Sequence, residues 1–132
     1  DANNITIAAN DGSSIVGRST VGGVISDIQM NGGLTANYSN FAASGLKIEG
    51  ANNVGGISGI ISNQTLDGAT VKNVTLVCTD KRTGIVAGAL GGPSTITNIN
   101  TDKVDGATNL VGATYDDASE VINNEGVFTA KN

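Results

Sequence analysis

The 132-residue chain has no histidine and no tryptophan, and it has only one cysteine, one proline, two phenylalanines and two tyrosines. Without histidine, it cannot form a Ser-His-Asp triad or a histidine-ligated metal site. The single cysteine, Cys78, excludes an internal disulfide and a metal site built from several thiolates. Because aromatic side chains are so scarce, the core must consist of small and β-branched residues, which favour strands.

Long apolar runs and concentrated positive charge are missing as well. No stretch of the sequence reaches the roughly 18 apolar residues that would predict a membrane-spanning helix. The opening DANNITIAAND does not have the basic start and apolar core of a signal peptide. The net charge is −5, and the seven lysines and arginines are scattered, whereas a nucleic-acid binder needs a basic patch. We therefore expect no nucleic-acid partner and no membrane insertion.

Glycine, asparagine and threonine are what the chain has in quantity. It contains 19 glycines against a single proline. These three residue types are poor helix formers, so the composition predicts many turns and strands. The length corresponds to one domain, residues 1–132.

A short pattern of threonine, an apolar residue and asparagine recurs along the chain. It appears as TVKNVTL around Asn73 and as TITNINT around Asn98. With these asparagines as anchors, similar positions recur along the whole chain at a mean spacing of about 24 residues, which indicates a structural repeat. The six anchors are Asn4, Asp27, Gly45, Asn73, Asn98 and Asn123.

Apolar and polar residues alternate after the first five anchors, as in a strand with one dry face and one wet face. Further apolar patches at 14–17, 53–56, 85–88 and 109–112 complete three short strands per repeat. The alternation predicts buried side chains at Ile5, Ile7, Ile28, Leu46, Ile48, Val74, Leu76 and Ile99. It predicts exposed side chains at Thr6, Lys47, Thr75 and Asn100.

Stacked repeats of this kind bury an apolar face that a single repeat cannot. We expect each strand to pair in parallel with its equivalent one turn away, in a β-solenoid of about five rungs with roughly 24 residues per turn. The asparagine column would form a hydrogen-bonded ladder. An antiparallel β-sandwich or barrel remains the alternative, because its strands recur every 8–12 residues as well.

The stretches NNVGGISGIISN, TGIVAGALGG and TNLVGATYDD resemble the GLUG motif, in which Gly-Gly-Leu-Val-Gly precedes a loop and a Thr-Ile-x-Asn strand. The leucine of the motif is replaced by isoleucine or alanine here. The resemblance implies a right-handed parallel β-helix in a bacterial cell-surface or secreted protein, often adhesin-like, and it brings no catalytic residues. The matching segments are 54–61 with 71–74, 85–91 with 96–99, 110–112 with 121–123, and 15–17 with 25–27.

Carboxylates are the remaining candidates for chemistry. In β-helix enzymes that cut acidic polysaccharides, clustered carboxylates bind calcium or act as acid and base. Only Lys103 stands close to these carboxylates, and platforms for sugar rings are scarce, so solvated turn positions explain them better. The candidates are Asp11, Asp102, Asp105, Asp116, Asp117 and Glu120.

We therefore predict a non-enzymatic structural or adhesive domain, extracellular or on the cell surface, with a glycan or host surface ligand as its possible partner. The sequence predicts no catalytic, cofactor-binding or metal-binding residue, no cofactor, and no calcium requirement for folding. A carbohydrate-active β-helix that binds or cleaves polysaccharide is the alternative. An ice-binding solenoid needs a regular Thr-x-Thr array, and only TIT at 95–97 qualifies.

A few single residues and the first rung complete the predictions. Cys78 continues the alternation of Val74 and Leu76, so we expect a buried and inert thiol. Aromatic residues should cover the core where the coil is irregular, and Phe128 could close the C-terminal end. The first rung should expose unpaired strand edges, which predicts a neighbouring domain or another copy of the chain at this end. The aromatic residues are Tyr38, Phe41, Tyr115 and Phe128.

Overall fold

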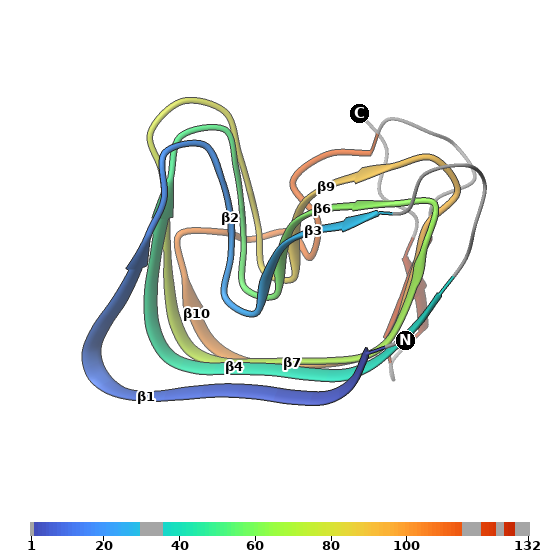
Figure 1. Ribbon diagram of the computed structural model, residues 1–132, viewed down its shortest axis with the longest axis horizontal. Coiled ribbons are helices and arrows are strands. Elements are labelled where there is room, and N and C mark those ends of the chain that lie inside the picture. The colour runs from blue at the N-terminus through green and yellow to red at the C-terminus, as the bar shows by residue number, and fades with distance from the viewer. Residues whose placement is uncertain (1, 30–35, 115–119, 124–125, 129–132) are drawn as a thin grey trace.

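The computed structural model describes residues 2–29, 36–114, 120–123 and 126–128, and only the backbone at 11, 120–123 and 126–128. These residues form twelve β-strands and no helix (Figure 1). The described part of the chain therefore contains no helix that could cross a membrane. The predictions for Asp116, Asp117 and Tyr115 fall outside the described residues, as do those for the side chains of Asp11, Glu120, Val121, Asn123 and Phe128.

The strands form one long sheet and two short ones. The long sheet contains, in spatial order, β1 (Ala2–Val16), β4 (Asn37–Gly50), β7 (Thr65–Cys78), β10 (Thr95–Asp105), β11 (Glu120–Asn123) and β12 (Gly126–Phe128). The second sheet contains β2 (Thr20–Gly22), β5 (Asn53–Gly55) and β8 (Arg82–Gly84), and the third contains β3 (Ile25–Gln29), β6 (Ser58–Ser62) and β9 (Ala87–Gly91).

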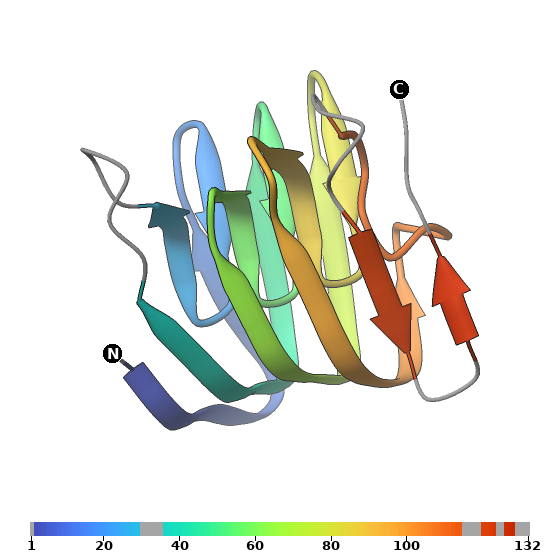
Figure 2. The same cartoon turned by 90° about the vertical axis from the view of Figure 1, so that its right-hand side faces the viewer.

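All strand pairs are parallel except β11 with β12. The chain passes through the three sheets in the same order in three successive turns, which stack side by side (Figure 2). This all-β parallel arrangement is compatible with a β-solenoid. The antiparallel sandwich is wrong for the described residues, because parallel neighbours cannot be joined by the hairpins of a sandwich.

Each long strand bends at two corners, where one residue takes a left-handed backbone conformation. The first corner consists of Asn4, Asn40, Gly68 and Asn98, one from each strand. The residues before and after this corner pair in register from strand to strand. The second corner consists of Gly45 in β4, Asn73 in β7 and Lys103 in β10. In β1, the register of pairing with β4 shifts at this corner, between Ala8 and Ser13. Asparagine and glycine suit these positions because they tolerate positive φ better than other residues.

The register corrects the predicted repeat. Ile5 pairs with Phe41, 36 residues later, Phe41 with Ala69, 28 later, and Ala69 with Ile99, 30 later. Only the last turn has the predicted length, because Thr95 pairs with Glu120, 25 residues later. The single length of 24 residues was wrong for the earlier turns because loops of different length join the same strands.

The predicted anchors also mix two corners of the coil. Asn4 and Asn98 belong to the first corner, whereas Gly45 and Asn73 belong to the second. Asp27 lies in β3 and pairs with Ile60, far from either corner. The similarity of TVKNVTL and TITNINT therefore does not reflect strand register. Both asparagines have positive φ and form corners, but the predicted alignment between them was wrong.

The core lies between the three sheets and is aliphatic apart from Phe41. Six of the eight residues predicted to be buried are buried, namely Ile28, Leu46, Ile48, Val74, Leu76 and Ile99. The four predicted to be exposed, Thr6, Lys47, Thr75 and Asn100, are exposed.

The prediction of burial was wrong for Ile5 and Ile7, which are 37% and 36% exposed. Both side chains share inward columns with buried residues, because Ile5 pairs with Phe41 and Ile7 pairs with Ala43. The alternation was therefore correct, but β1 is the edge strand of the long sheet, so no described turn covers these two isoleucines on the other side.

Candidate functional site

The outward side chains of the long sheet form in-register columns, in which six of eight residues are polar and two are alanine. Between the two corners, the strands β1, β4, β7 and β10 place two columns on the outside, which we call the polar face. It consists of Thr6, Ala42, Thr70 and Asn100 in one column and Ala8, Ser44, Lys72 and Asp102 in the other. A repeated strand spacing of about 4.8 Å separates neighbours within each column.

Side-chain hydrogen bonds link successive turns beside this face, at the first corner. Asn40 Nδ2 donates to Asn4 Oδ1 over 2.9 Å. The predicted ladder of anchor asparagines was wrong, because Asn73 and Asn98 are not in register. Gly68 occupies the next position of the corner and has no side chain to continue the hydrogen bonds from turn to turn. Asn98 Nδ2 donates to a carboxylate oxygen of Asp67 instead, and Thr97 Oγ1 donates to the same oxygen over 2.7 Å.

The carboxylate of Asp67 accepts two side-chain hydrogen bonds at this corner. The hydrogen bond from Thr97, and then the one from Asn98, hold the pKa of Asp67 below its ordinary value, because both stabilise the charged form. The sequence prediction missed Asp67. The aspartate is recognisable only once TLDG is aligned with TITN, 30 residues later.

The carboxylates that the sequence singled out do not converge in the described residues. Asp102 lies on the polar face in register with Lys72, and Asp105 lies beyond the second corner in register with Thr75. Both are exposed. Among the residues whose side chains the structure describes, no group of three Asp, Glu or Cys side chains could hold a metal ion. The absence of a calcium requirement stays a prediction, checked by melting temperatures with calcium and with a chelator.

A notch of about 560 Å³ opens where the fourth turn is shorter than the third. Thr75 pairs with Asp105, 30 residues later, but Ala87 pairs with Val111, only 24 later. The fourth turn, which follows β10, therefore crosses below the tip of the loop between β7 and β8 (Figure 1). This leaves β8 at the edge of its sheet. Ten residues line the notch, from the segments 81–83, 104–109 and 112.

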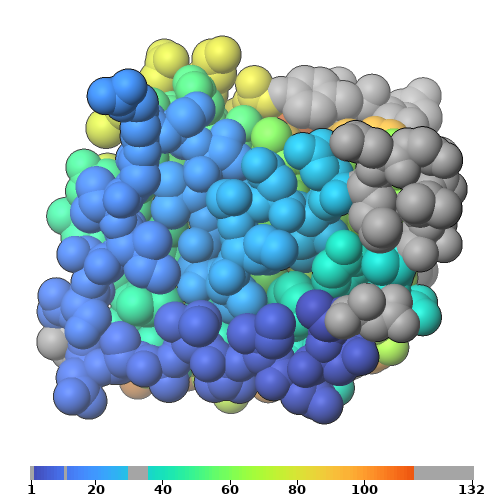
Figure 3. Space-filling view, viewed as in Figure 1, coloured from blue at the N-terminus to red at the C-terminus, as the bar shows by residue number. Residues whose placement is uncertain are grey.

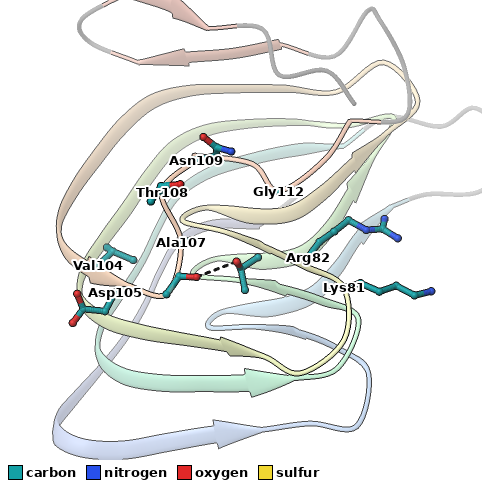
Figure 4. A pocket seen from close by; sticks show the side chains of 10 residues that line it. Lys81, Arg82, Val104, Asp105, Ala107, Thr108, Asn109 and Gly112 are labelled. Carbon is teal, nitrogen blue, oxygen red and sulfur yellow. Dashed lines mark hydrogen bonds between the residues drawn. The ribbon is translucent and has the colours of Figure 1, made fainter.

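The charged side chains of the notch point away from one another. Lys81 and Arg82 extend on one side, whereas Asp105 points to the opposite side (Figure 4). Across the middle, the hydroxyl of Thr83 donates to the carbonyl oxygen of Gly106 over 3.1 Å. A ligand site needs polar groups that converge on one position. The notch is therefore a consequence of the shortened turn and has no constellation for chemistry.

The single residues singled out from the sequence are structural. Cys78 was expected to be buried but is only half-buried. It packs against the core, and its thiol donates to the carbonyl oxygen of Ala51 over 3.1 Å. Tyr38 and Phe41 pack edge to face, with ring centroids 6.2 Å apart. Phe41 is fully buried within the core, and Tyr38 is partly buried against it. Both pair in register with β7, so the expected irregular coil at these residues was wrong.

Comparison with known proteins adds no family. No family model matches the chain, no curated protein matches it, and no solved structure matches its fold.

Proposed function

We propose that this chain is a non-catalytic structural or adhesive domain, extracellular or on the surface of a bacterial cell. In this proposal it is a right-handed parallel β-helix of about five rungs, in which β11 begins the fifth rung. It would bind a glycan or host surface ligand, and its N-terminal rung would meet a neighbouring domain or another copy. The resemblance to GLUG-type repeats supports the class of protein.

The observation that carries the proposal is the column of hydroxyl and amide groups on the polar face. Thr70 and Asn100 are in register on neighbouring strands, whereas Ala42 separates Thr70 from Thr6 in the first turn. Groups that recur at the spacing of the strands can donate equivalent hydrogen bonds to successive units of a polymer. Lys72 and Asp102 in the next column add one charge of each sign.

A glycan array with the labelled chain tests the adhesive half of the proposal. The double variant Thr70→Ala, Asn100→Ala should weaken binding about 25-fold, since each hydrogen bond contributes about 1 kcal/mol. Thr75→Ala is the matched control, because Thr75 is an exposed threonine of the same sheet beyond the second corner.

The same preparation tests the non-catalytic half. Incubation with the glycans that bind, with and without calcium, should release no new reducing ends. Depolymerisation would replace the proposal with the carbohydrate-active alternative. Failure to bind any glycan or host surface would leave a passive structural role, with the adhesive role rejected.

A further inference from the structure

Two stretches of the chain share the sequence Asp-Gly-Ala-Thr, at 67–70 in the third turn and at 105–108 in the fourth. Both begin with an aspartate followed by a glycine of positive φ, 100° at Gly68 and 94° at Gly106. The first turn, which forms the end face in Figure 3, contains a further pair of this kind, Asp11–Gly12. An aspartate isomerises more readily before glycine than before other residues, because no neighbouring side chain hinders attack on its carboxyl carbon.

The isomerisation proceeds through a cyclic imide and needs only water. The amide nitrogen of the glycine attacks Cγ of the aspartic acid, so that a nitrogen–carbon bond forms and the carboxyl OH leaves with the amide hydrogen as water. Water then adds at the main-chain carbonyl carbon of the aspartate and breaks its bond to nitrogen. The product is isoaspartate, in which the main chain runs through Cβ and Cγ and is one carbon longer. Such an intramolecular attack is fast only where the side chain can turn towards the nitrogen.

The structure restrains Asp67 against this reaction. Its carboxylate accepts hydrogen bonds from Thr97 Oγ1 over 2.7 Å and from Asn98 Nδ2. Strands lie on both sides of it, since Asp67 pairs with Ser39 of β4 and with Thr97 of β10. The carboxylate must leave both donors before Cγ can reach the nitrogen of Gly68. The hydrogen bonds from Thr97 and Asn98 also lower the pKa of Asp67, which disfavours the acid form that reacts.

Asp105 has none of these restraints from the part of the chain that the structure describes. It is the last residue of β10 and pairs with Thr75 on one side, whereas β11 pairs only with the beginning of β10. No described side chain donates to its carboxylate, which is exposed and points away from Lys81 and Arg82 (Figure 4). Gly106 is exposed as well and follows the end of the strand. The side chain of Asp105 can therefore turn towards the nitrogen of Gly106 without breaking a described hydrogen bond.

We propose that Asp105–Gly106 is a site of spontaneous modification to isoaspartate, whereas the fold protects Asp67–Gly68. This goes beyond the proposed function and does not depend on glycan binding. Because the two sites share the next two residues, the difference between them comes from the fold and not from the local sequence.

The extra carbon enters the chain where there is little room for it. The backbone at Gly106 lies so close to β7 that an added Cβ would come within 1.9 Å of the carbonyl oxygen of Leu76. The carbonyl oxygen of Gly106 also accepts the hydrogen bond from Thr83 over 3.1 Å. A longer main chain must shift these contacts. The modification therefore loosens the fourth turn from the third at the point where the two begin to differ in length.

Peptide mapping of the 132-residue chain after prolonged warm incubation at neutral pH tests the proposal first. Electron-transfer fragmentation distinguishes isoaspartate from aspartate in peptides of equal mass. Isoaspartate should accumulate about tenfold faster at position 105 than at position 67, because the reaction at 67 must first break two hydrogen bonds. Equal rates at the two positions, or no isoaspartate at position 105, would overturn the proposal.

Two controls show whether the fold causes the difference. In the chain unfolded in urea, both sites should isomerise at the same rate, and a difference that persisted there would contradict protection by the fold. The double variant Thr97→Val, Asn98→Gly removes both donors to Asp67, and glycine tolerates the φ of 54° at position 98. It should speed isomerisation at position 67 about tenfold and leave the rate at 105 unchanged. An unchanged rate at position 67 would refute the protective role of the two hydrogen bonds.

Hydrogen exchange of the chromatographically separated isoaspartate form tests the consequence. The amides of Ile85 and Val86 donate to the fourth turn, so their exchange should speed up, whereas the amide of Ile57 donates to the third turn and should not change. Asp105→Glu is the matched control, since it keeps the charge but would have to close a larger imide ring, and its exchange should stay constant during incubation. Equal exchange at Ile85 in the modified and unmodified chains would show that the fourth turn is not loosened.

Discussion

Ile5 and Phe41 occupy equivalent positions in successive turns, yet Ile5 is 37% exposed and Phe41 is 1% exposed. The same contrast separates Ile7 from Ala43. Both side chains of each pair point inward, so the alternation of the sequence is equally regular in both turns. The comparison teaches that the place of a turn in the stack decides burial, because an inward residue is covered only when turns lie on both sides of it.

The largest effect should come from the buried member of this pair. Phe41→Ala should lower the free energy of unfolding by about 3–5 kcal/mol, because it removes core area and leaves a cavity. It also removes the edge-to-face contact with Tyr38. Ile5→Ala should cost only about 1 kcal/mol, because water already contacts the side chain and no closed cavity forms. Denaturant unfolding of both variants gives the comparison, and equal losses would show that the first turn is as well covered as the second.

A second contrast should separate two adjacent residues of an interior turn. Leu76 is 3% exposed and Thr75 is exposed. Leu76→Ala should cost about 2–5 kcal/mol through lost burial and a cavity. Thr75→Ala should change stability by less than about 0.5 kcal/mol, as is usual for surface positions. Similar denaturation midpoints for the two variants would contradict the inward and outward assignment of β7.

Alternation was the part of the structure that the sequence predicted well. The inward residues Ile48, Val74 and Leu76 follow period two, which depends only on the local pleat of each strand. The parallel pairing was predicted as well, since stacked repeats require it. The turn lengths were not predictable, because β1 needs 36 residues to reach its equivalent in β4 whereas β4 needs 28. Surface loops of different length connect the same strands at little energetic cost.

The corners explain why the register was misjudged. Both corners require positive φ, and Asn, Gly and even Lys103 satisfy that requirement. An asparagine therefore marks a corner without saying which one. The Asp67 interaction remained hidden for the same reason, because it depends on which residue of β10 lies beside β7.

Substitutions at the first corner should change stability more through backbone strain than through the loss of a side-chain hydrogen bond. Asn40 has φ 57° and donates to Asn4. Asn40→Ala should cost about 1–2 kcal/mol, because alanine is strained in the left-handed region. Asn40→Gly loses the same hydrogen bond but relieves the strain, so it should cost less than about 1 kcal/mol. If the two variants had equal thermal stability, the hydrogen bond would outweigh the backbone at this corner.

The smallest expected effect is a difference in the pH dependence of stability between two hydrogen-bonded groups at the first corner. Asn4 and Asn40 form a neutral pair, whereas Asn98 and Thr97 donate to the carboxylate of Asp67. The pKa of Asp67 is lowered from 3.8 in the folded chain. A carboxylate with a lowered folded-state pKa contributes stability that is present above the unfolded-state pKa and is lost as the pH falls through the folded-state value. Stability should therefore fall slightly more in the original chain than in Asp67→Asn as the pH drops below 3.8.

The effect should be small and weakened by salt, because Asp67 is exposed. Denaturation midpoints at neutral pH and at about pH 2, at low and high salt, measure it. Asn40→Ala is the matched control, since it breaks the neutral pair and should lower stability by the same amount at both pH values. A pH response of Asp67→Asn equal to that of the original chain would show that the hydrogen bonds of Thr97 and Asn98 do not depend on the charge of Asp67. The hydrogen bonds to Asp67 would then contribute to stability as the neutral Asn4–Asn40 pair does, independently of pH.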